Sequence, residues 1–333
     1  MSDTYEPSVL ARRDGRVGRL ILNRPKALNA LDLTMIRLIE TALVEWRDDP
    51  SVHAVVIEGA GGKAFCAGGD IRGLRDDAVA GNAEGIHRFF SEEYRLNLMI
   101  AHYPKPYVAL IDGICMGGGI GISVHAPYRV ASEAAMFAMP ETAIGFFPDV
   151  GATSFLPRLP GHLGMYLGLS GARVQGADAV HAGLATHFVP REKIAELSAA
   201  LAAEGVACMA RFTAPMPAFT LEGDMAAIER CFGAPDVASI FARLEAESGD
   251  WAAKTLATMR AMSPSAVIWS FKAINDGAGQ TLAQALQAEL ALSAKVTKHP
   301  DFPEGVRSVV IDKDRNAKWQ PAMLAEALQN TLI

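Results

Sequence analysis

The sequence contains little cysteine. Four cysteines occur among 333 residues, and no two of them have the C-x-x-C spacing of a zinc or redox site. They are too few and too scattered for a disulfide scaffold, so we interpret them as free thiols in a reducing compartment. The histidines are isolated as well, and no metal site is expected. The cysteines are Cys66, Cys115, Cys208 and Cys231.

An excess of positive charge is also missing. The chain has 31 lysines and arginines against 37 aspartates and glutamates, which gives a net charge of −6 with histidine neutral. A mildly acidic chain lacks the basic balance of a general nucleic-acid binder, although a local basic pocket could still hold an anionic ligand. Half of the residues are hydrophobic, which argues against global disorder and allows a sizeable core.

Long hydrophobic runs are missing too. The first 16 residues have no apolar run and carry acids early, which argues against a secretory signal or a transit peptide. The most membrane-like window, Tyr107–Val124, contains Asp112 and five glycines, so it is a poor spanning helix. The sequence therefore predicts a soluble, cytoplasmic protein without a membrane partner.

The fingerprints of nucleotide-binding loops are absent. The glycine-rich segment that contains Gly117 and Gly119 departs from the pattern G-x-G-x-x-G at Ile122. There is also no G-x-x-x-x-G-K-S/T phosphate loop. Enzymes that use nicotinamide cofactors or nucleoside triphosphates are therefore disfavoured.

What is present is an alternation of strand-like and helix-like segments in the first half of the chain. Apolar β-type runs alternate with segments whose apolar residues recur at helical spacing. This pattern predicts an α/β core with right-handed crossovers. The expected strands are Arg16–Leu22, Val52–Ile57 and Tyr107–Ile111, and the expected helices are Asp32–Trp46, capped by Asp32, and Glu84–Ile100.

Alanine-rich helical stretches dominate from about residue 190. Pro215 and Pro217 mark a loop near this change, and we place a domain boundary near residue 205. Residues 1–205 are expected to form the α/β core with the active site, and residues 206–333 a helical C-terminal domain. The expected helices are Lys193–Ala210, Met225–Cys231, Ser239–Ala246, Trp251–Met262 and Thr281–Lys298.

Two glycine-rich loops follow separate strands. The first, Lys63–Arg72, contains Gly68 and Gly69, and the second, Ile114–Gly121, contains three successive glycines. Glycine lets backbone amides face a ligand, and the loops after parallel strands meet at one edge of a sheet. One amide from each loop could therefore form an oxyanion hole for a carbonyl oxygen that gains charge. A tight turn and close helix packing are the alternatives without a ligand.

Two carboxylates stand eight residues apart in the otherwise apolar segment Phe137–Gly151. Apolar neighbours should desolvate Glu141 and Asp149 and raise their pKa, which makes both acids candidate catalytic groups. A first-turn acid on a short helix is the alternative for Glu141, and a helix cap is the alternative for Asp149.

Together these stretches resemble the crotonase, or enoyl-CoA hydratase/isomerase, superfamily over nearly the whole chain. Within it, the likeness is greatest to the hydrolases of 3-hydroxyacyl-CoA thioesters. The segments that carry the resemblance are Asn23–Leu31, Lys63–Arg72, Gly117–Gly119, Phe137–Gly145, Phe147–Gly151, Phe155–Leu159, Ala185–Phe188, Glu304–Arg307 and Ile311–Asp314.

The resemblance implies a crotonase-like spiral of βαβ units, followed by a helical C-terminal domain, and an acyl-CoA thioester as substrate. It assigns the oxyanion hole to the backbone N–H groups of Gly69 and Gly118. Hydratases carry their first catalytic glutamate where this chain has Gly121, which puts hydration of a C=C bond in doubt. The family also places Glu93 near the acyl group; a solvated helix face is the alternative for that residue.

The reaction that the resemblance implies is hydrolysis of 3-hydroxyisobutyryl-CoA to 3-hydroxyisobutyrate and CoA, a step in valine breakdown. Glu141 would attack the acyl carbon or activate a water, and Asp149 would accept a hydrogen bond from the 3-hydroxyl group. Arg72 and Lys63 are candidates for contacts with the CoA phosphates, with ordinary surface charge as the alternative.

Two other functions remain open at this stage. One is hydration or isomerisation of an enoyl-CoA with Glu141 as the sole acid/base. The other is a non-catalytic acyl-CoA-binding protein, against which the retained Glu141 and Asp149 argue. No cofactor beyond the CoA of the substrate is expected, and a homo-oligomer is compatible with the resemblance.

Overall fold

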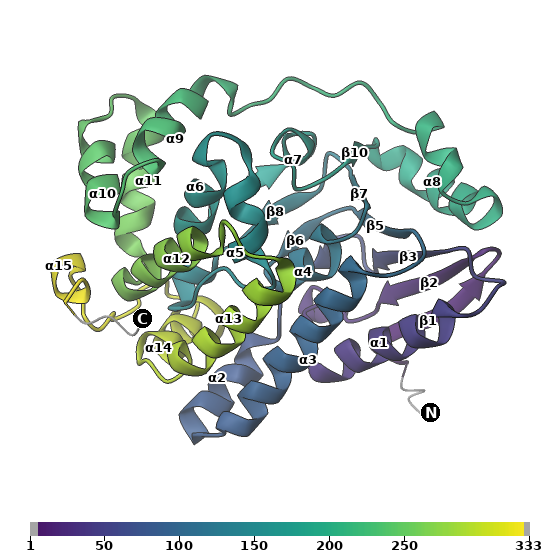
Figure 1. Cartoon of the computed structure of the whole chain (residues 1–333), viewed down its shortest axis with the longest axis horizontal. Helices are drawn as coiled ribbons and strands as arrows, with labels where there is room; N and C mark the ends of the chain where they lie inside the picture. The colour runs from purple at the N-terminus through teal and green to yellow at the C-terminus, as the bar shows by residue number, and fades with distance from the viewer. Residues whose placement is uncertain (1–5, 330–333) are drawn as a thin grey trace. The chain divides into compact units, whose positions relative to one another are not determined.

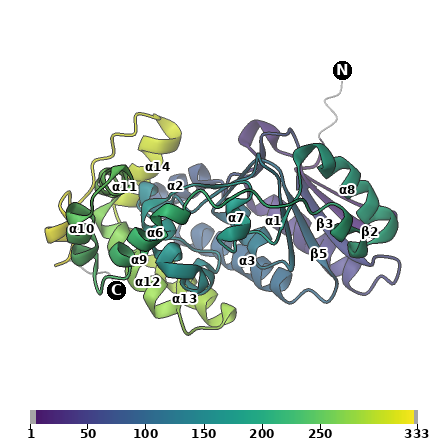
Figure 2. The same ribbon diagram turned by 90° about the horizontal axis from the view of Figure 1, so that it is seen from above.

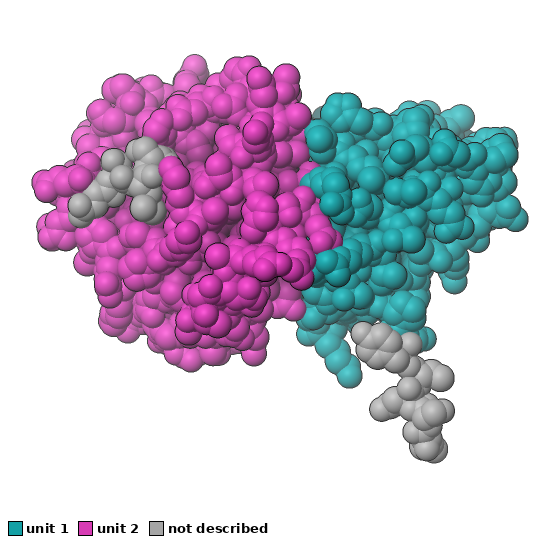
Figure 3. Space-filling model, turned by 60° about the horizontal axis from the view of Figure 1, so that its bottom comes forward, with its two compact units in different colours: residues 1–69, 95–137, 174–219 teal, residues 70–94, 138–173, 220–333 magenta. Residues whose placement is uncertain are grey.

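The computed structural model describes residues 6–329, which divide into two compact units. Unit 1 comprises the residues up to 69 together with 95–137 and 174–219. Unit 2 comprises residues 70–94, 138–173 and those from 220 onward (Figure 3). The boundary expected near residue 205 divides the chain into two continuous stretches, whereas each compact unit is made of several separate segments. The expected boundary therefore stays a prediction.

Unit 1 is built on β-sheet, which confirms the predicted α/β core (Figure 1). A six-stranded sheet has the order β1-β2-β3-β5-β7-β10, in which β1 and β2 form an antiparallel hairpin and the other pairs are parallel. A second sheet has the order β4-β6-β8-β9. The strands are β1 Val9–Asp14, β2 Val17–Leu22, β3 Ala54–Gly59, β4 Ala64–Cys66, β5 Tyr107–Ile111, β6 Ile114–Met116, β7 Tyr128–Ala131, β8 Met136–Ala138, β9 Val174–Gln175 and β10 His187–Phe188.

The first helix, α1 (Leu33–Arg47), begins where the sequence predicts. The Asp32 side chain accepts a hydrogen bond from the Met35 amide at 2.8 Å, which satisfies one of the unpaired N–H groups of the first turn. Helix α3 (Ala83–Ala101) begins in unit 2 and ends in unit 1. The remaining short helices of unit 1 are a 3-10 helix at Pro25–Ala27, α4 (Gly118–Val124) and α7 (Asp178–His181).

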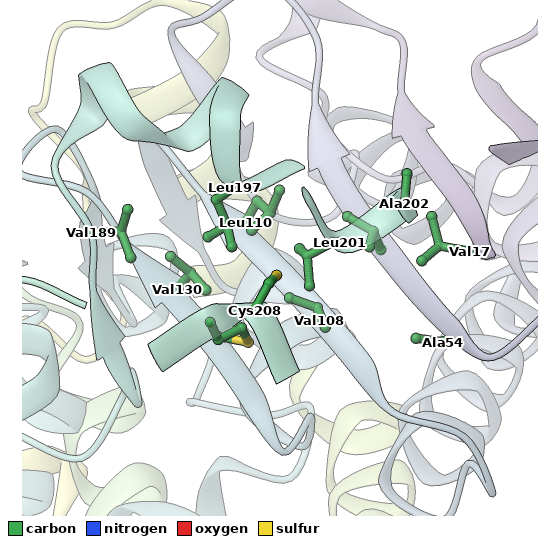
Figure 4. Packing of buried hydrophobic residues seen from close by; sticks show 12 residues of the cluster. Val17, Ala54, Val108, Leu110, Val130, Val189, Leu197, Leu201, Ala202 and Cys208 are labelled. Atoms are coloured by element: carbon green, nitrogen blue, oxygen red, sulfur yellow. The ribbon is translucent and has the colours of Figure 1, made fainter. Parts of the chain in front are cut away.

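Helix α8 (Arg191–Glu204) and the 3-10 helix Val206–Arg211 cover one face of the large sheet (Figures 2 and 4). The buried side chains of β2, β3, β5 and β7 meet those of α8 in a hydrophobic cluster. A single helix over Lys193–Ala210 is wrong, because Gly205 adopts φ +74°, which ends the helical conformation. Among the labelled members of the cluster are Val17, Val108, Leu110, Val130, Leu197 and Leu201.

Unit 2 consists mainly of helices. The predicted alanine-rich helices are confirmed, apart from shifts of one or two residues at their ends. Helix α12 was not expected, although Ser263 caps it and Pro264 occupies its first turn. The α-helices are α2 Ile71–Ala80, α5 Ala152–Phe155, α6 Leu163–Ser170, α9 Met225–Phe232, α10 Val237–Ala246, α11 Asp250–Ala261, α12 Pro264–Gly277, α13 Leu282–Val296, α14 Asp301–Val306 and α15 Leu324–Ala327. Short 3-10 helices lie at Glu141–Ile144 (η2), Leu156–Arg158, Pro160–His162 and Glu222–Asp224, and a π-helix lies at Arg307–Ile311.

Within residues 6–329, none of the helices has both the length and the apolar character needed to cross a membrane. The four cysteines are buried, and none of them forms a disulfide bond.

Candidate active site

Four of the buried carboxylic acids of unit 2 are linked by charge interactions with Asp149 or are Asp149 itself. Glu93 is 2 % exposed, Glu141 7 %, Asp149 6 % and Glu289 1 %. Each comes from a different segment: α3, η2, the loop before α5, and α13. Charged side chains are rarely buried without partners, so a cluster of this kind indicates a functional site.

Glu141 is the first residue of η2, which follows Pro140. The turn ends at Gly145 with φ +66°, where a side chain would collide with the Asp301 carbonyl of α14. The Glu141 Oε2 atom is buried and has no hydrogen-bond partner among the described residues. Burial, followed by the nearby charge of Asp149, raises the pKa of Glu141 well above its usual value. The short helix named as the alternative is therefore present, and it holds a buried acid.

Asp149 lies in the loop between η2 and α5. The Tyr94 hydroxyl donates a hydrogen bond to Asp149 Oδ2 at 2.7 Å. Burial raises the pKa of Asp149 to about 7, and the Tyr94 bond opposes part of that rise. The alternative of a helix cap is wrong, because Gly151 occupies the N-cap position of α5.

Glu93 points into the protein. Its Oε1 atom has no hydrogen-bond partner among the described residues, and burial followed by the charge of Asp149 raises its pKa well above the usual value. The alternative of a solvated helix face is therefore wrong. The structure brings Glu93, Glu141 and Asp149 close enough for their charges to interact.

Sequence reasoning missed Glu289 and the role of Tyr94. Glu289 accepts hydrogen bonds from the backbone of Gly151 and Thr153, and burial raises its pKa to about 8. Its neighbours three residues away on α13, Leu286 and Leu292, are buried. An acid on the apolar face of an amphipathic helix was the signal that could have identified it.

Several aromatic rings of unit 2 pack against one another beside Tyr94, the partner of Asp149. Phe90 stacks on Phe146 with ring centroids 5.4 Å apart, and Phe146 stacks on Phe147 at 4.6 Å. Phe90 also contacts Tyr94, whose hydroxyl bonds to Asp149. Apolar neighbours of this kind keep water from the Asp149 carboxyl, and desolvation is the largest cause of its raised pKa.

In unit 1, the first glycine loop is held by the Asn23–Leu31 segment. The buried Asn29 side chain donates to the carbonyls of Ala60 and Ala64 at 3.0 and 2.9 Å. The Leu31 amide donates to the Gly68 carbonyl at 2.8 Å. This bonding uses the carbonyl of Gly68 and leaves the Gly69 N–H without an acceptor among the described residues.

The second glycine loop lies against the first. Strands β4 and β6 pair in parallel, and a Cβ atom added to Gly68 would lie 3.8 Å from the Gly118 amide nitrogen. Gly118 opens α4, so its N–H lies in the first turn, where helices have no internal acceptor. At Gly119 a side chain would collide with the Cys66 carbonyl. The glycines therefore permit the close approach of the two loops.

Lys63 and Arg72 are exposed. Arg72 lies on α2 and donates to the Val310 carbonyl at 3.3 Å. Their contact with CoA phosphates stays a prediction. In the described part of the chain, no group of three or more His, Cys, Asp or Glu side chains is arranged to hold a metal ion.

Comparison with known proteins identifies the family. The family model of enoyl-CoA hydratase/isomerase matches residues 17–332. The chain belongs to the enoyl-CoA hydratase/isomerase family. Curated relatives include the mitochondrial 3-hydroxyisobutyryl-CoA hydrolases of Xenopus tropicalis, 49 % identical over 95 % of this chain and 85 % of the relative, and of Homo sapiens, 45 % identical over 97 % and 87 %.

Solved structures from this family have the same fold. A carnitinyl-CoA dehydratase from Mycobacterium thermoresistibile has a TM-score of 0.93 and 40 % identity, and the match covers 96 % of this chain and 94 % of that one. An enoyl-CoA hydratase from Rhodobacter sphaeroides has a TM-score of 0.91 and 40 % identity, with 98 % of each chain covered. The predicted crotonase fold and the resemblance on which it rested are confirmed.

The expectation of a cytoplasmic protein is contradicted by the relatives. Those at 43–49 % identity are named as mitochondrial proteins. The expectation rested on the composition of the first 16 residues and the absence of apolar runs. A compartment is set by address segments that receptors read, and composition of the enzyme itself does not carry that information.

Proposed function

We propose that this chain hydrolyses a short-chain 3-hydroxyacyl-CoA thioester, and that 3-hydroxyisobutyryl-CoA is its substrate. The products would be 3-hydroxyisobutyrate and free CoA, a step in valine breakdown. The observation that carries the proposal is the buried pair of acids, Glu141 with an unpartnered oxygen and Asp149 fixed by Tyr94. The relatives named as 3-hydroxyisobutyryl-CoA hydrolases support the same reaction.

The backbone amides of Gly69 and Gly118 are proposed to hold the thioester carbonyl oxygen. Neither N–H has an acceptor among the described residues, so both remain available to a ligand. Preorganised amides stabilise the negative charge that develops on this oxygen when the acyl carbon is attacked. Removing one such donor typically costs about 3 kcal/mol of transition-state stabilisation.

Glu141 is proposed to drive the cleavage by one of two routes. In the first, its carboxylate attacks the acyl carbon, the C–S bond breaks, CoA leaves as a thiolate that takes up a proton, and water then hydrolyses the mixed anhydride. In the second, Glu141 accepts a proton from the water that attacks the acyl carbon, the C–S bond breaks, and the proton passes to the CoA thiolate that leaves. Both routes balance with water as the only co-reactant, so no further cofactor is proposed.

Asp149 is proposed to select the acyl group. Its Oδ1 atom would accept a hydrogen bond from the 3-hydroxyl of the substrate while Oδ2 stays bonded to Tyr94. An acyl group without the hydroxyl could not make this hydrogen bond, so the site would discriminate against it. Glu93 is proposed to contact the same part of the substrate, and Lys63 and Arg72 the CoA phosphates.

The hydratase alternative is weakened by one residue. Gly121 stands where hydratases carry their first catalytic glutamate, and it lies buried within α4. A single remaining glutamate, Glu141, would have to deliver and remove every proton. Assembly into a homo-oligomer is proposed from the family relationship alone and is checked by sedimentation velocity.

A panel of thioesters monitored with a thiol reagent tests the proposal. We expect CoA release from 3-hydroxyisobutyryl-CoA, slower release from 3-hydroxypropionyl-CoA, and the slowest release from isobutyryl-CoA. In parallel, crotonyl-CoA is monitored through its enoyl absorbance. Loss of that absorbance without thiol release would support a hydratase, and inertness toward the whole panel would support a binding protein.

A further inference from the structure

Glu289 is a buried acid that the proposed reaction does not use. Three donors converge on its carboxylate: the Gly151 N–H on Oε2 at 2.8 Å, and the Thr153 N–H and hydroxyl on Oε1 at 3.1 and 2.6 Å. An ionised carboxylate has two oxygens that only accept hydrogen bonds, so it can pair with all three donors at once. All three donors belong to the turn that directly follows Asp149.

The backbone of this turn is strained. Val150 has φ +55°, a region that β-branched residues rarely adopt, and Gly151 follows with φ +88°. A residue held in such a conformation costs on the order of 1–3 kcal/mol and keeps it only where its surroundings enforce it. Because Val150 is bonded to Asp149, the strained turn determines where the Asp149 side chain lies.

Close packing by α12 supports this turn together with the Glu289 hydrogen bonds, because a Cβ atom added at Gly277 would lie 2.1 Å from the Thr153 carbonyl oxygen. A cavity of about 230 Å³ adjoins the turn, and its lining includes Thr153, Glu289, Gln280 and Lys272. At the other end of the turn, the Asp149 carboxyl accepts a hydrogen bond from the Tyr94 hydroxyl.

We propose that Glu289 is a positioning residue that holds the turn of residues 149–153 in its strained conformation and so aims Asp149 at the substrate's 3-hydroxyl. The inference rests on the proposed function, because Asp149 is there assigned to that hydroxyl. Glu289 does not touch the substrate. It acts on acyl-group selection through the backbone that carries Asp149.

The substitution Glu289→Gln tests this inference. Glutamine keeps the volume and one accepting oxygen, but its NH2 group opposes one of the three donors. We expect kcat on 3-hydroxyisobutyryl-CoA to fall on the order of 10²-fold with KM little changed, since small displacements of a reacting group have effects of this size. The ratio of kcat/KM between 3-hydroxyisobutyryl-CoA and isobutyryl-CoA should fall with it.

Ser293→Ala provides the matched control. Ser293 is buried one turn further along α13 and donates to the Leu290 carbonyl, without contact to the turn among its hydrogen bonds. This variant should keep the substrate ratio. A Glu289→Gln protein with a lowered melting temperature and an unchanged ratio would overturn the inference, because the role of Glu289 would then be structural alone. Equal losses on both substrates would overturn it too.

Two further measurements keep the inference testable. If Glu289→Gln does not fold, Thr153→Val, which removes only the 2.6 Å bond, must lower the substrate ratio in the same direction by a smaller factor. Crystal structures of the wild type and Glu289→Gln give a readout without turnover. We expect Val150 to leave the positive-φ region or the Tyr94–Asp149 bond to break, and an unaltered turn would refute the inference.

A failure of the proposed function can be distinguished from a failure of this inference. If the wild-type protein releases no CoA from any thioester, the hydrolase assignment is wrong whatever Glu289 does. If the wild type prefers 3-hydroxyisobutyryl-CoA and Glu289→Gln keeps that preference, only the positioning role is lost.

Discussion

The glycine loops of unit 1 and the acid cluster of unit 2 illustrate two ways to build a reactive site. The loops present backbone N–H groups whose charge does not depend on pH, and they are shaped by glycines that admit no side chain. The cluster presents four side-chain carboxyls whose pKa values are raised by burial. Substitutions in the first region should therefore change geometry alone, whereas substitutions in the second should also change proton binding.

The largest effect is expected in the acid cluster, from Glu141→Gln. Glutamine keeps the shape of the side chain but cannot attack the acyl carbon or accept a proton, so kcat for CoA release should fall on the order of 10³-fold. Stopped-flow thiol detection measures it. Glu222→Gln, at an exposed acid of the same unit, is the control that should retain activity. Retained turnover in Glu141→Gln would remove Glu141 from the mechanism.

Asp149→Asn should have the next largest effect, and it should depend on the substrate. We expect an approximately 10²-fold loss of kcat/KM on 3-hydroxyisobutyryl-CoA, because the amide changes the pairing with both Tyr94 and the substrate hydroxyl. The loss on isobutyryl-CoA should be several-fold smaller. Steady-state kinetics on the two thioesters decide the matter: equal losses would mean that Asp149 does not recognise the hydroxyl.

In unit 1, Gly68→Ala should lower activity through geometry. Gly68 has φ +111°, and an added Cβ would lie 3.3 Å from the Met116 carbonyl, so the loop must shift. We expect kcat to fall about tenfold, which is part of the 10²–10³-fold effect of losing an oxyanion donor. The pH profile of kcat should keep its shape. A shifted profile would show that a substitution in the glycine loops also changes proton binding, which contradicts the difference proposed between the loops and the acid cluster.

Gly73→Ala is the matched control for that substitution. Gly73 lies within α2, and a Cβ there would meet no atom within 4 Å. Alanine has a higher helix propensity than glycine, so this variant should be more stable by about 0.5–1 kcal/mol and fully active. Urea denaturation together with the thiol assay separates the two glycine variants.

The two regions should also differ in their effect on the pH dependence of stability. The pKa of Asp149 rises from 3.8 to about 7 on folding, and that of Glu289 from 4.5 to about 8. Between these limits the folded state binds more protons than the unfolded state, so the free energy of unfolding falls as pH increases from about 4 to about 8. Above pH 8 this contribution stays lost, and below pH 4 it is fully present.

Urea denaturation at pH 5, 6, 7 and 8 measures this slope, which is at most about 1.4 kcal/mol per pH unit for each group. Asp149→Asn removes one of the groups and should flatten the fall. Gly68→Ala, which changes no titratable side chain, should lower the curve by the same amount at every pH. A curve for Asp149→Asn parallel to that of the wild type would contradict the assignment of this titration.

Much of the local structure could be read from the sequence. The periodic apolar residues after Asp32 and the apolar run Tyr107–Ile111 predicted a helix and a strand whose bounds nearly match the structure. The motifs at Gly68 and Glu141 identified the family. Gly205 was overlooked inside an alanine-rich run, because the helical pattern on either side outweighed one residue whose backbone conformation ended the helix.

Residue types and their spacing by themselves determined the alternation of strands and helices, the glycine loops and the identity of two candidate acids, because these are properties of short stretches of chain. Tertiary structure alone decided which acids share one buried environment. Glu93 and Glu289 lie far from Glu141 in sequence, and only folding removes their water and lets their charges interact. It also decided the hydrogen bonds of Tyr94 and Glu289 around Asp149, since a pKa and an orientation depend on neighbours that the linear chain does not specify.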